Sequence, residues 1–414
     1  MKVLLISANT ERSHMLTLPL GLGLVAEATR RAGHEVAFLD LLAASDPRQV
    51  LGEVLTSTQP EVIGISIRNI DDQNRQDPHF LLDEAKWVVA GCRAASAAPI
   101  VLGGAGFSIF PREVLAYLKA DFGIRGDGER AFPRLLECAR KGLDPRAIPG
   151  VHAFGESVDR GRAEADDLDA LALWDESLIE NRPDNPETLW LPIQSRRGCP
   201  NDCSYCSTSR IQGRRIRCRS SALVADELEA LQRSGFRRFY FVDNSFNLPE
   251  SQAFELCREI KARHLAITWR CILYPHLLSE NLVRAMAEAG CTEVSLGFES
   301  GSTRVLAEMN KRFRAEDVRR ASELVAAHGI RSMGFLLLGG PGETRETVQE
   351  SLVFARSLHL DELKITVGIR IYPGTPLARR AVEEGLLRPE ESLLQPTFYL
   401  APGLEPWIHE AVRA

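Results

Sequence analysis

Short apolar runs alternate with amphipathic stretches over the first 150 or so residues of the chain. The runs have the length of strands, and the stretches between them have apolar positions at helical spacing. Apolar strands separated by helices are typical of a parallel sheet covered on both faces. We therefore expect a doubly wound, Rossmann-like α/β domain over residues 1–142. The expected strands are Lys2–Ser7, Glu35–Leu39, Glu61–Ser66, Ile100–Leu102 and Asp121–Ile124, and the expected helices are Leu20–Arg31, Pro47–Ser57, Phe80–Ala95, Pro111–Lys119 and Arg130–Lys141.

The alternation fades over residues 143–190, where prolines and acidic residues predict an irregular linker with a few short strands or turns. It resumes with six strand–helix repeats, which predict a partial parallel (β/α)6 barrel over residues 191–377. Residues 378–414 are expected to form a tail that closes the barrel mouth or packs at the domain interface. The expected barrel strands are Ile193–Arg197, Arg238–Val242, Ile267–Leu273, Glu293–Phe298, Met333–Leu338 and Lys364–Ile371, and the expected helices are Ser221–Arg233, Ser251–Arg263, Ser279–Ala289, Ala315–Ala327 and Arg345–Ser357.

The composition is that of an ordinary globular protein, with 44% hydrophobic residues, 26% charged residues and a net charge of −6. This balance gives no sign of a nucleic-acid-binding tail or a membrane-surface helix. The longest apolar runs are too short to span a bilayer, and the N-terminus is typical of a buried strand rather than a signal peptide. Nine cysteines without a paired pattern favour a reducing compartment, so we expect the cytoplasm.

Three cysteines, Cys199, Cys203 and Cys206, lie close together at the spacing C-x3-C-x2-C. Thiolates at short loop spacings bind iron–sulfur clusters, and three of them can hold a four-iron cluster with one iron left open. The alternatives are an incomplete zinc site or chance. A structural zinc site requires four ligands, and the nearest further cysteine is Cys218. We therefore predict a [4Fe–4S] cluster at the carboxyl end of the barrel, where active sites of such barrels lie.

Polar and glycine residues follow the strands of the N-terminal domain. In doubly wound sheets, ligands bind beyond the carboxyl ends of the strands. Glycines there either let the backbone approach a ligand or serve tight strand-to-helix turns. No G-x-G-x-x-G follows the first strand, so a nicotinamide dinucleotide site is not supported. The candidate binding residues are Asn9, Thr10, Ser66, Arg68, Asn69, Gly103, Gly104, Gly126, Gly128 and Glu129.

The barrel half resembles the radical S-adenosylmethionine (SAM) enzymes. Beside the cysteine triad, Gly297–Ser302, Gly339–Thr344 and Ile371–Leu377 are similar to the family's fourth-, fifth- and sixth-strand motifs. The resemblance implies that the open iron binds the amino and carboxylate groups of SAM, and that one electron cleaves SAM to a 5′-deoxyadenosyl radical. The SAM contacts that it implies are Tyr205, Glu299, Ser300, Gly339, Gly340 and Tyr372.

Two further residues are candidates for the SAM pocket. Arg270 and Trp269 alternate faces of their strand, and an inward Arg270 would need an anion such as the carboxylate of SAM or of a substrate. The alternative for Arg270 is a surface salt bridge. Asn244 follows a strand and either lines the pocket or caps a turn.

The N-terminal domain resembles the cobalamin-binding domain that precedes many radical SAM domains. The D-x-H-x-x-G motif of cobalamin-dependent mutases is absent, because His14 has no Asp two positions before it. The resemblance therefore implies a cobalt without a histidine lower ligand, whose lower face is left to the loop Arg68–Asp72 or to water. It also adds Leu20 and Gly21 to the cobalamin contacts. The similar stretches are Pro19–Leu22, Gly33–Val36, Pro60–Ser66, Leu102–Gly104 and Gly126–Glu129.

Together these resemblances imply a cobalamin-dependent radical SAM enzyme. Its expected reaction is hydrogen abstraction from an unactivated carbon and methyl transfer from methylcobalamin, on a small-molecule or natural-product intermediate. Its expected partners are that substrate and an electron donor such as flavodoxin or ferredoxin, with no nucleic acid and no membrane. The alternatives are an oxidoreductase, ring-contractase or cyclase without methyl transfer, and a non-catalytic cobalamin-binding sensor. Methylthiolation of tRNA is disfavoured, because only Cys92 and Cys138 precede the triad.

Overall fold

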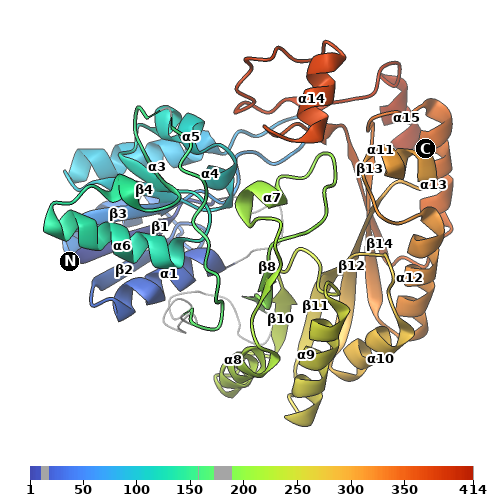
Figure 1. Ribbon diagram of the computed structural model, residues 1–414, viewed down its shortest axis with the longest axis horizontal. Coiled ribbons are helices and arrows are strands. Elements are labelled where there is room, and N and C mark those ends of the chain that lie inside the picture. Colours follow the sequence, from blue (N-terminus) through green and yellow to red (C-terminus); the bar gives the residue numbers. More distant parts are fainter. Residues whose placement is uncertain (11–17, 157, 172–188, 414) are drawn as a thin grey trace. The chain divides into compact units, whose positions relative to one another are not determined.

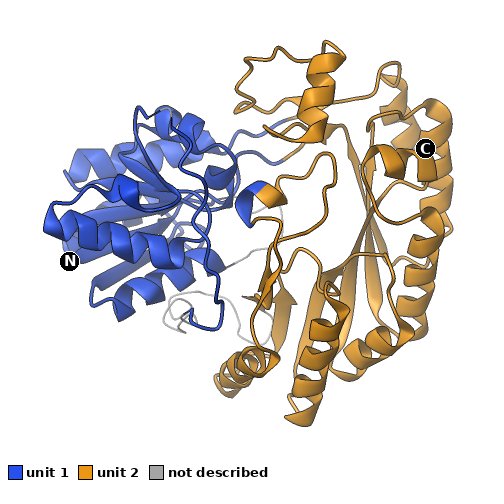
Figure 2. Ribbon diagram, in the orientation of Figure 1, with its two compact units in different colours: residues 1–72, 78–183, 210–212 blue, residues 73–77, 184–209, 213–414 orange. Residues whose placement is uncertain are grey.

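The structure is a computed structural model that describes residues 1–10, 18–156, 158–171 and 189–413. The chain forms two compact units (Figure 2). Each unit consists mainly of one half of the chain and also includes a short segment from the other half. Unit 1 contains residues 1–72, 78–183 and 210–212, and unit 2 contains residues 73–77, 184–209 and 213–414.

Unit 1 is a doubly wound sheet, which confirms the predicted fold class. Its six strands lie in the order β2-β1-β3-β4-β5-β6, and all neighbours are parallel except β5 and β6 (Figure 1). The strands are β1 (Lys2–Ser7), β2 (Glu35–Asp40), β3 (Val62–Ser66), β4 (Ile100–Gly103), β5 (Phe122–Ile124) and β6 (Val151–Ala153), and the helices are α1 (Leu20–Arg31), α2 (Pro47–Thr58), α3 (Leu82–Ala95), α4 (Ala105–Ile109), α5 (Pro111–Leu118) and α6 (Gly128–Lys141).

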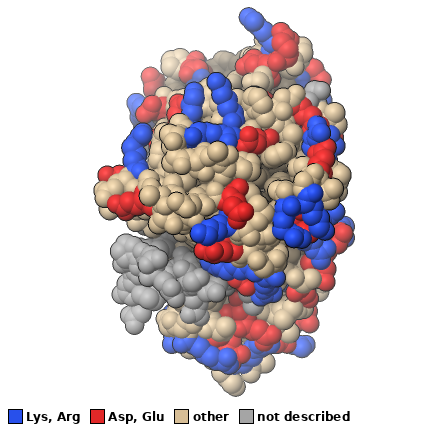
Figure 3. All heavy atoms as spheres, turned by 90° about the vertical axis from the view of Figure 1, so that its left-hand side faces the viewer, with Lys and Arg blue, Asp and Glu red and all other residues tan. Residues whose placement is uncertain are grey.

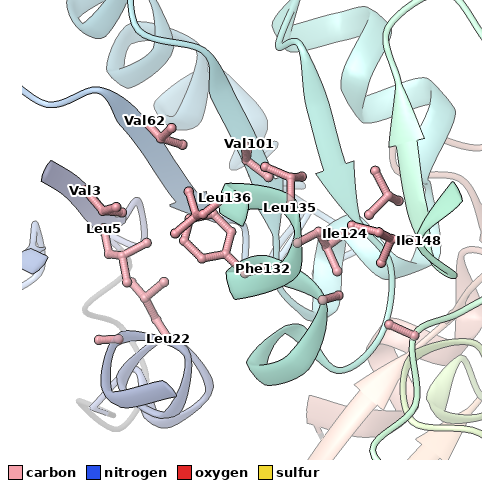
Figure 4. Close-up of a cluster of buried hydrophobic side chains, with 14 residues drawn as sticks. Val3, Leu5, Leu22, Val62, Val101, Ile124, Phe132, Leu135, Leu136 and Ile148 are labelled. Atoms are coloured by element: carbon pink, nitrogen blue, oxygen red, sulfur yellow. The ribbon is translucent and has the colours of Figure 1, made fainter. Parts of the chain in front are cut away.

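One part of the core of unit 1 lies between the sheet and two helices, α1 and α6. Val3, Leu5 and Phe132 are among its buried side chains (Figure 4). The two helices also pack closely on each other, since a Cβ at Gly128 would lie 2.9 Å from Val25 Cγ2. A glycine at the start of α6 therefore serves helix packing, without any need for a ligand.

Unit 2 contains a six-stranded parallel sheet in the order β14-β13-β12-β11-β10-β7. Neighbouring strands follow one another along the chain, and among the described residues the sheet ends at β7 and β14, as in a partial barrel. The predicted barrel is thus confirmed. The strands are β7 (Trp190–Ile193), β10 (Arg238–Phe241), β11 (Thr268–Leu273), β12 (Cys291–Glu299), β13 (Arg331–Leu338) and β14 (Glu362–Val367), and the intervening helices are α8 (Ser221–Arg233), α9 (Glu250–Ala262), α10 (Glu280–Glu288), α11 (Thr303–Glu308), α12 (Ala315–Ala327) and α13 (Arg345–Arg356).

Smaller elements complete unit 2. Strand β8 (Arg196–Arg197) pairs with β9 (Arg217–Cys218), and β15 (Ile369–Arg370) pairs with β16 (Phe398–Tyr399), in both cases antiparallel. The remaining helices are α7 (Thr208–Ile211), α14 (Pro376–Glu383) and α15 (Trp407–Arg413). No helix in the described part of the chain has both the length and the apolar character needed to cross a membrane.

The first predicted barrel strand is interrupted between β7 and β8. The buried carboxylate of Asp243 accepts hydrogen bonds from the N–H groups of Ser195 and Arg196, at 2.9 and 3.1 Å. It also accepts the Ser195 hydroxyl at 2.5 Å and lies 3.6 Å from the Arg196 guanidinium. Backbone donors that bind a side chain cannot join the sheet, so the strand ends at Ile193 and the chain turns toward the cysteine loop.

The predicted linker differs from the structure in its described part. Its residues up to 171 belong to unit 1, where β6 pairs with β5 and Ala163 bridges to Gly126. Gly126 has φ 93°, and a Cβ there would lie 2.3 Å from the Ala163 carbonyl oxygen. The described part of the predicted linker is therefore packed against unit 1 at both places. Residues 172–188 of the predicted linker lie outside the described residues.

Candidate active site

The three cysteines of the triad lie on the loop that follows β8. The Cys206 N–H donates to the Cys203 carbonyl at 3.2 Å, and the Cys199 N–H donates to the Gly213 carbonyl at 3.0 Å. Gly198, which precedes the loop, has φ 92°, and a Cβ there would lie 2.1 Å from the Arg215 carbonyl oxygen. Only glycine fits this position, so the close approach of the two backbone segments fixes where the loop begins.

The thiols of the triad can bind an iron–sulfur cluster without converging on one ion. No three His, Cys, Asp or Glu side chains of the described residues converge as ligands of one ion. In a cluster, each thiolate binds a different iron, so the sulfur atoms need not converge. Burial raises the pKa of Cys199 and of Cys203, and Lys311 acts in the opposite direction on both. Binding of the metal would therefore displace protons from these thiols.

A segment after α11, residues 309–312, is bonded to the cysteine loop. The Met309 carbonyl accepts the Ser204 N–H at 2.9 Å. Asn310 donates to the Asp202 carbonyl at 3.3 Å, and Arg312 pairs with the Asp202 carboxylate at 3.1 Å. The loop is thus held by side chains and backbone that lie about a hundred residues further along the chain. Sequence reasoning did not identify this segment.

Lys311, in the middle of that segment, is a buried cation beside the cysteine loop. Its Nζ lies 3.1 Å from Glu299 Oε1 and 5.3 Å from the centroid of the Tyr205 ring. The Lys311 and Glu299 side chains are 5% and 14% exposed. Burial lowers the pKa of Lys311, but the Glu299 carboxylate, Tyr205 and Cys203 together raise it by more, so the net shift is upward. Lys311 therefore carries a positive charge next to two predicted SAM contacts, Tyr205 and Glu299.

Glu299 has an unusual backbone conformation at the carboxyl end of β12. Its φ of 63° is in the left-handed region, and the register with β13 shifts between Gly297 and Glu299. A bulge with a left-handed non-glycine residue re-aims a side chain at some cost in strain, and such positions cluster at functional sites. This geometry gives the predicted SAM contact at Glu299 physical support.

The other polar groups of the predicted SAM motifs are used within the protein. The Ser300 side chain is fully buried, lies 2.9 Å from the Ser351 hydroxyl and accepts the Ser302 N–H at 3.1 Å. The N–H groups of Gly339 and Gly340 both donate to the Glu343 carboxylate. SAM contacts by Ser300, Gly339 and Gly340 stay predictions, and the structure explains these residues by packing.

Glu343 is a buried acid that the sequence did not single out. It is 4% exposed, and its second carboxylate oxygen, Oε1, is buried without a hydrogen-bond partner. Burial raises the pKa of Glu343 to about 7, although the two glycine N–H groups act to lower it. Its charge state therefore changes near neutral pH, at the turn that follows β13.

This shift predicts a pH-dependent stability. Because the folded protein binds the Glu343 proton more tightly than an unfolded chain with a pKa of 4.5, its stabilisation is complete below that pH and is lost as pH rises through about 7. The loss should be about 3 kcal/mol. Urea unfolding at pH 5 and pH 7.5 should show most of this loss, about 2.4 kcal/mol, in the difference between wild type and Glu343→Gln, which keeps the oxygen acceptor. An equal pH dependence in both proteins would contradict the assignment.

Arg270 finds its partners within the sheet. Trp269 is fully buried against Phe241, whereas Arg270 points to the other face and pairs with Glu293 at 3.4 Å. Its guanidinium also lies 4.2 Å from the centroid of the Trp190 ring. Glu293 is paired with Arg270 near the start of β12, six residues before Glu299. Glu293 is therefore the anionic partner of Arg270, where the sequence analysis considered the carboxylate of SAM or of a substrate. A SAM contact by Arg270 stays a prediction.

Two predicted SAM residues lie after the ends of barrel strands. Asn244 is half-buried and follows the buried Asp243 at the end of β10. Tyr372 is half-buried, and the Arg370 guanidinium lies 5.2 Å from the centroid of its ring. Both positions agree with an active site at the carboxyl ends of the strands, and neither contact with SAM is tested further.

The predicted cobalamin residues gather in part around one cavity in unit 1, at the switch point between β1 and β3. Asn9, Thr10, Ser66, Arg68 and Asn69 all line it. It adjoins an open cavity of about 590 Å³, with which it shares Thr10 as a lining residue. Ligands of doubly wound sheets bind at this point of the fold, so the placement agrees with the prediction, and cobalamin contacts by these five residues stay predictions.

The remaining cobalamin predictions receive structural explanations. Gly104 has φ 98°, and a Cβ there would lie 2.5 Å from the Ile67 carbonyl oxygen. Glu129 is 5% exposed in the first turn of α6. The contacts predicted for Gly103, Gly104, Gly126, Gly128, Glu129, Leu20 and Gly21 stay predictions. His14, the histidine without the mutase motif, lies outside the described residues.

Comparisons with known proteins agree with the candidate sites of the two units, each taken by itself. The model of the radical SAM superfamily matches residues 193–355, and the model of the B12 binding domain matches residues 6–136. The chain is 27% identical to an uncharacterized methyltransferase of Pyrococcus horikoshii, over 94% of this chain and 84% of the relative. It is 25% identical to a tryptophan 2-C-methyltransferase of Streptomyces laurentii, over 91% of this chain and 74% of the relative.

A solved structure shares the fold of nearly the whole chain. The radical SAM methyltransferase TsrM from Kitasatospora setae, with tryptophan and a SAM analogue bound, superposes with a TM-score of 0.86 at 24% identity. The match covers 99% of this chain and 87% of TsrM. Two family models in this order, on a shared two-domain fold, identify the chain: it is a radical SAM protein with an N-terminal cobalamin-binding domain.

Proposed function

We propose that this protein is a cobalamin-dependent radical SAM C-methyltransferase that acts on a small molecule. The observation that carries the proposal is the presence, in one chain, of a built cysteine loop with a buried cation and a switch-point cavity in a B12 binding domain. Several relatives that match this chain over most of their own length are named as methyltransferases. Their names support methyl transfer rather than a rearrangement without it.

The residues of unit 2 would hold the cluster and SAM. Cys199, Cys203 and Cys206 bind the three irons, and Lys311 and Glu299 place a positive and a negative charge beside them. SAM carries one carboxylate and one amino group, so a buried ion pair offers complementary partners to both. When bound, the cluster supplies one electron for the cleavage of SAM.

The residues of unit 1 would hold cobalamin, which supplies a methyl group for transfer when it is bound. Asn9, Ser66 and Asn69 offer amide and hydroxyl groups to the amide side chains of the corrin ring. Arg68 lies in the loop predicted to face the lower side of cobalt. A guanidinium there cannot act as a metal ligand, because it stays protonated, so it agrees with a cobalt without a protein ligand from this residue.

We further infer a reducing compartment, the cytoplasm, and an electron donor such as flavodoxin or ferredoxin. All nine cysteines are free, which agrees with a reducing environment.

Lys and Arg side chains lie among Asp and Glu side chains over the face in Figure 3, so this face lacks an extended basic surface of the kind that binds nucleic acid.

The proposal is tested with SAM whose methyl group carries deuterium. Anaerobic protein reconstituted with iron, sulfide and cobalamin, and supplied with a one-electron reductant and a candidate small-molecule acceptor, should transfer the labelled methyl to that acceptor. S-adenosylhomocysteine is then the co-product of methylation, and 5′-deoxyadenosine is the co-product of hydrogen abstraction. A product that gains a labelled methyl identifies a methyltransferase. A turned-over substrate with an unchanged carbon count would instead identify a rearrangement.

A further inference from the structure

The loop between β3 and α3 forms a finger, which we define as residues 70–81. Its base is closed by an antiparallel bridge between Asp71 and Phe80. Next to the bridge, the Asp72 N–H donates to the His79 carbonyl at 3.2 Å, and the His79 N–H donates to the Asp72 carboxylate at 3.1 Å. These bonds hold the two sides of the base together, and the residues between Asp72 and His79 form the tip.

The tip of the finger belongs to unit 2, whereas both sides of its base belong to unit 1. Residues 73–77 are part of unit 2 (Figure 2). Arg75 forms two hydrogen bonds with the Glu405 carboxylate, at 2.9 and 2.6 Å. Beside this pair, Gln76 Nε2 lies 2.8 Å from His409 Nδ1. Two parallel N–H···O bonds from one guanidinium give directional as well as electrostatic attachment.

The seat of Arg75 depends on a glycine. Gly368 lies between β14 and β15 with φ 81°, and a Cβ there would lie 2.4 Å from Arg75 Cδ. Its N–H donates to the Leu338 carbonyl at 2.8 Å, which holds this backbone against the sheet. The Arg75 side chain is only 22% exposed in this seat, and its hydrogen bonds lower the pKa of Glu405. The seat is thus shaped for an arginine stem.

We propose that Arg75 is a positioning residue: its ion pair with Glu405 holds the tip of the finger and thereby orders the loop Arg68–Asp72, at the start of the finger, for cobalamin. The inference rests on the proposed function, because that loop is the one predicted to face cobalt. Loosening the tip should let the loop sample more conformations in the free protein. Cobalamin would then bind less tightly, because binding would have to order the loop again.

Limited digestion with trypsin tests the tether without any cofactor reaction. Trypsin requires a free arginine side chain. It should therefore cleave after Arg75 only when the native state opens, and cleavage of the wild-type protein at this position should be slow. Glu405→Gln removes the charge partner of Arg75 and should speed cleavage after Arg75 by about three- to fivefold, the scale of a partly exposed pair. Glu390→Gln, at an exposed carboxylate in the same C-terminal part of the chain, is the matched control and should leave the rate unchanged.

A titration with hydroxocobalamin, followed by absorbance, tests the positioning role. Glu405→Gln should raise the Kd by about three- to fivefold, and the charge exchange Arg75→Glu with Glu405→Arg should restore most of it. An unchanged cleavage rate after Arg75, or faster cleavage with an unchanged Kd, would overturn the proposal. If the wild-type protein binds no cobalamin, the proposed function fails, and an unchanged digestion pattern would then separately refute the tether.

Discussion

Replacing Cys203 with alanine is expected to abolish both the bound cluster and the cleavage of SAM. Cys203 is the central member of the triad, and the chain turns at it, since its carbonyl accepts the Cys206 N–H. Removing one of three thiolates leaves an iron without its protein ligand. Loss of a group that only supports a metal ligand already lowers metal affinity or activity by about 10- to 100-fold. Loss of the ligand itself should therefore lower both by more than about 100-fold.

The measurement is the electron paramagnetic resonance signal of the reduced, anaerobically reconstituted protein, together with the amount of SAM cleaved. Cys218→Ala is the matched control, because Cys218 is also half-buried but lies on β9, outside the triad. It should keep the cluster signal and SAM cleavage. A Cys203→Ala protein that still cleaves SAM would refute the assignment of the triad.

Replacing Lys311 with methionine is expected to lower both stability and SAM affinity. The substitution keeps an unbranched apolar stem but leaves the Glu299 carboxylate buried without its cation. Breaking a buried ion pair from one side costs about 3 kcal/mol or more in unfolding free energy. SAM should also bind at least about tenfold more weakly, because a charge-assisted contact contributes about 1.5–3 kcal/mol.

A double variant separates the two effects. Adding Glu299→Gln to Lys311→Met removes the unpaired charge, so most of the lost stability should return. SAM affinity should stay low, because the cation is still missing. Urea unfolding and equilibrium dialysis of the reconstituted proteins measure the two quantities. Wild-type SAM affinity in Lys311→Met would show that the ion pair serves the fold alone.

Much of the fold was predictable because the strands carry their own signal. Apolar runs such as Lys2–Ser7 and helices such as Leu20–Arg31 were predicted with the bounds that the structure has. The misses arise from long-range partners. The predicted strand Ile193–Arg197 breaks because Asp243, almost fifty residues later, takes its backbone donors. The strand β6 lies in a segment where we expected only a few short strands or turns, and its pairing with β5 fixes its bounds.

The site was predictable where chemistry depends on local spacing. The triad and Glu299 lie in recognisable patterns, and the structure gives both a built environment. Lys311 carried no such signal, because its importance comes from burial beside Glu299 and Tyr205 rather than from its neighbours in sequence. Ser300 lies in the family's fourth-strand motif, but its hydroxyl is already hydrogen-bonded to the Ser351 hydroxyl.

The fate of the labelled methyl group of SAM, in the absence of any substrate, tests the central claim most directly. Wild-type protein loaded with iron, sulfide and reduced cobalamin should release S-adenosylhomocysteine, with the deuterated methyl recovered on cobalamin at about one equivalent per chain. Cys218→Ala should behave in the same way. Bound cobalamin that never gains the label, with SAM cleaved only to 5′-deoxyadenosine, would contradict a methyltransferase.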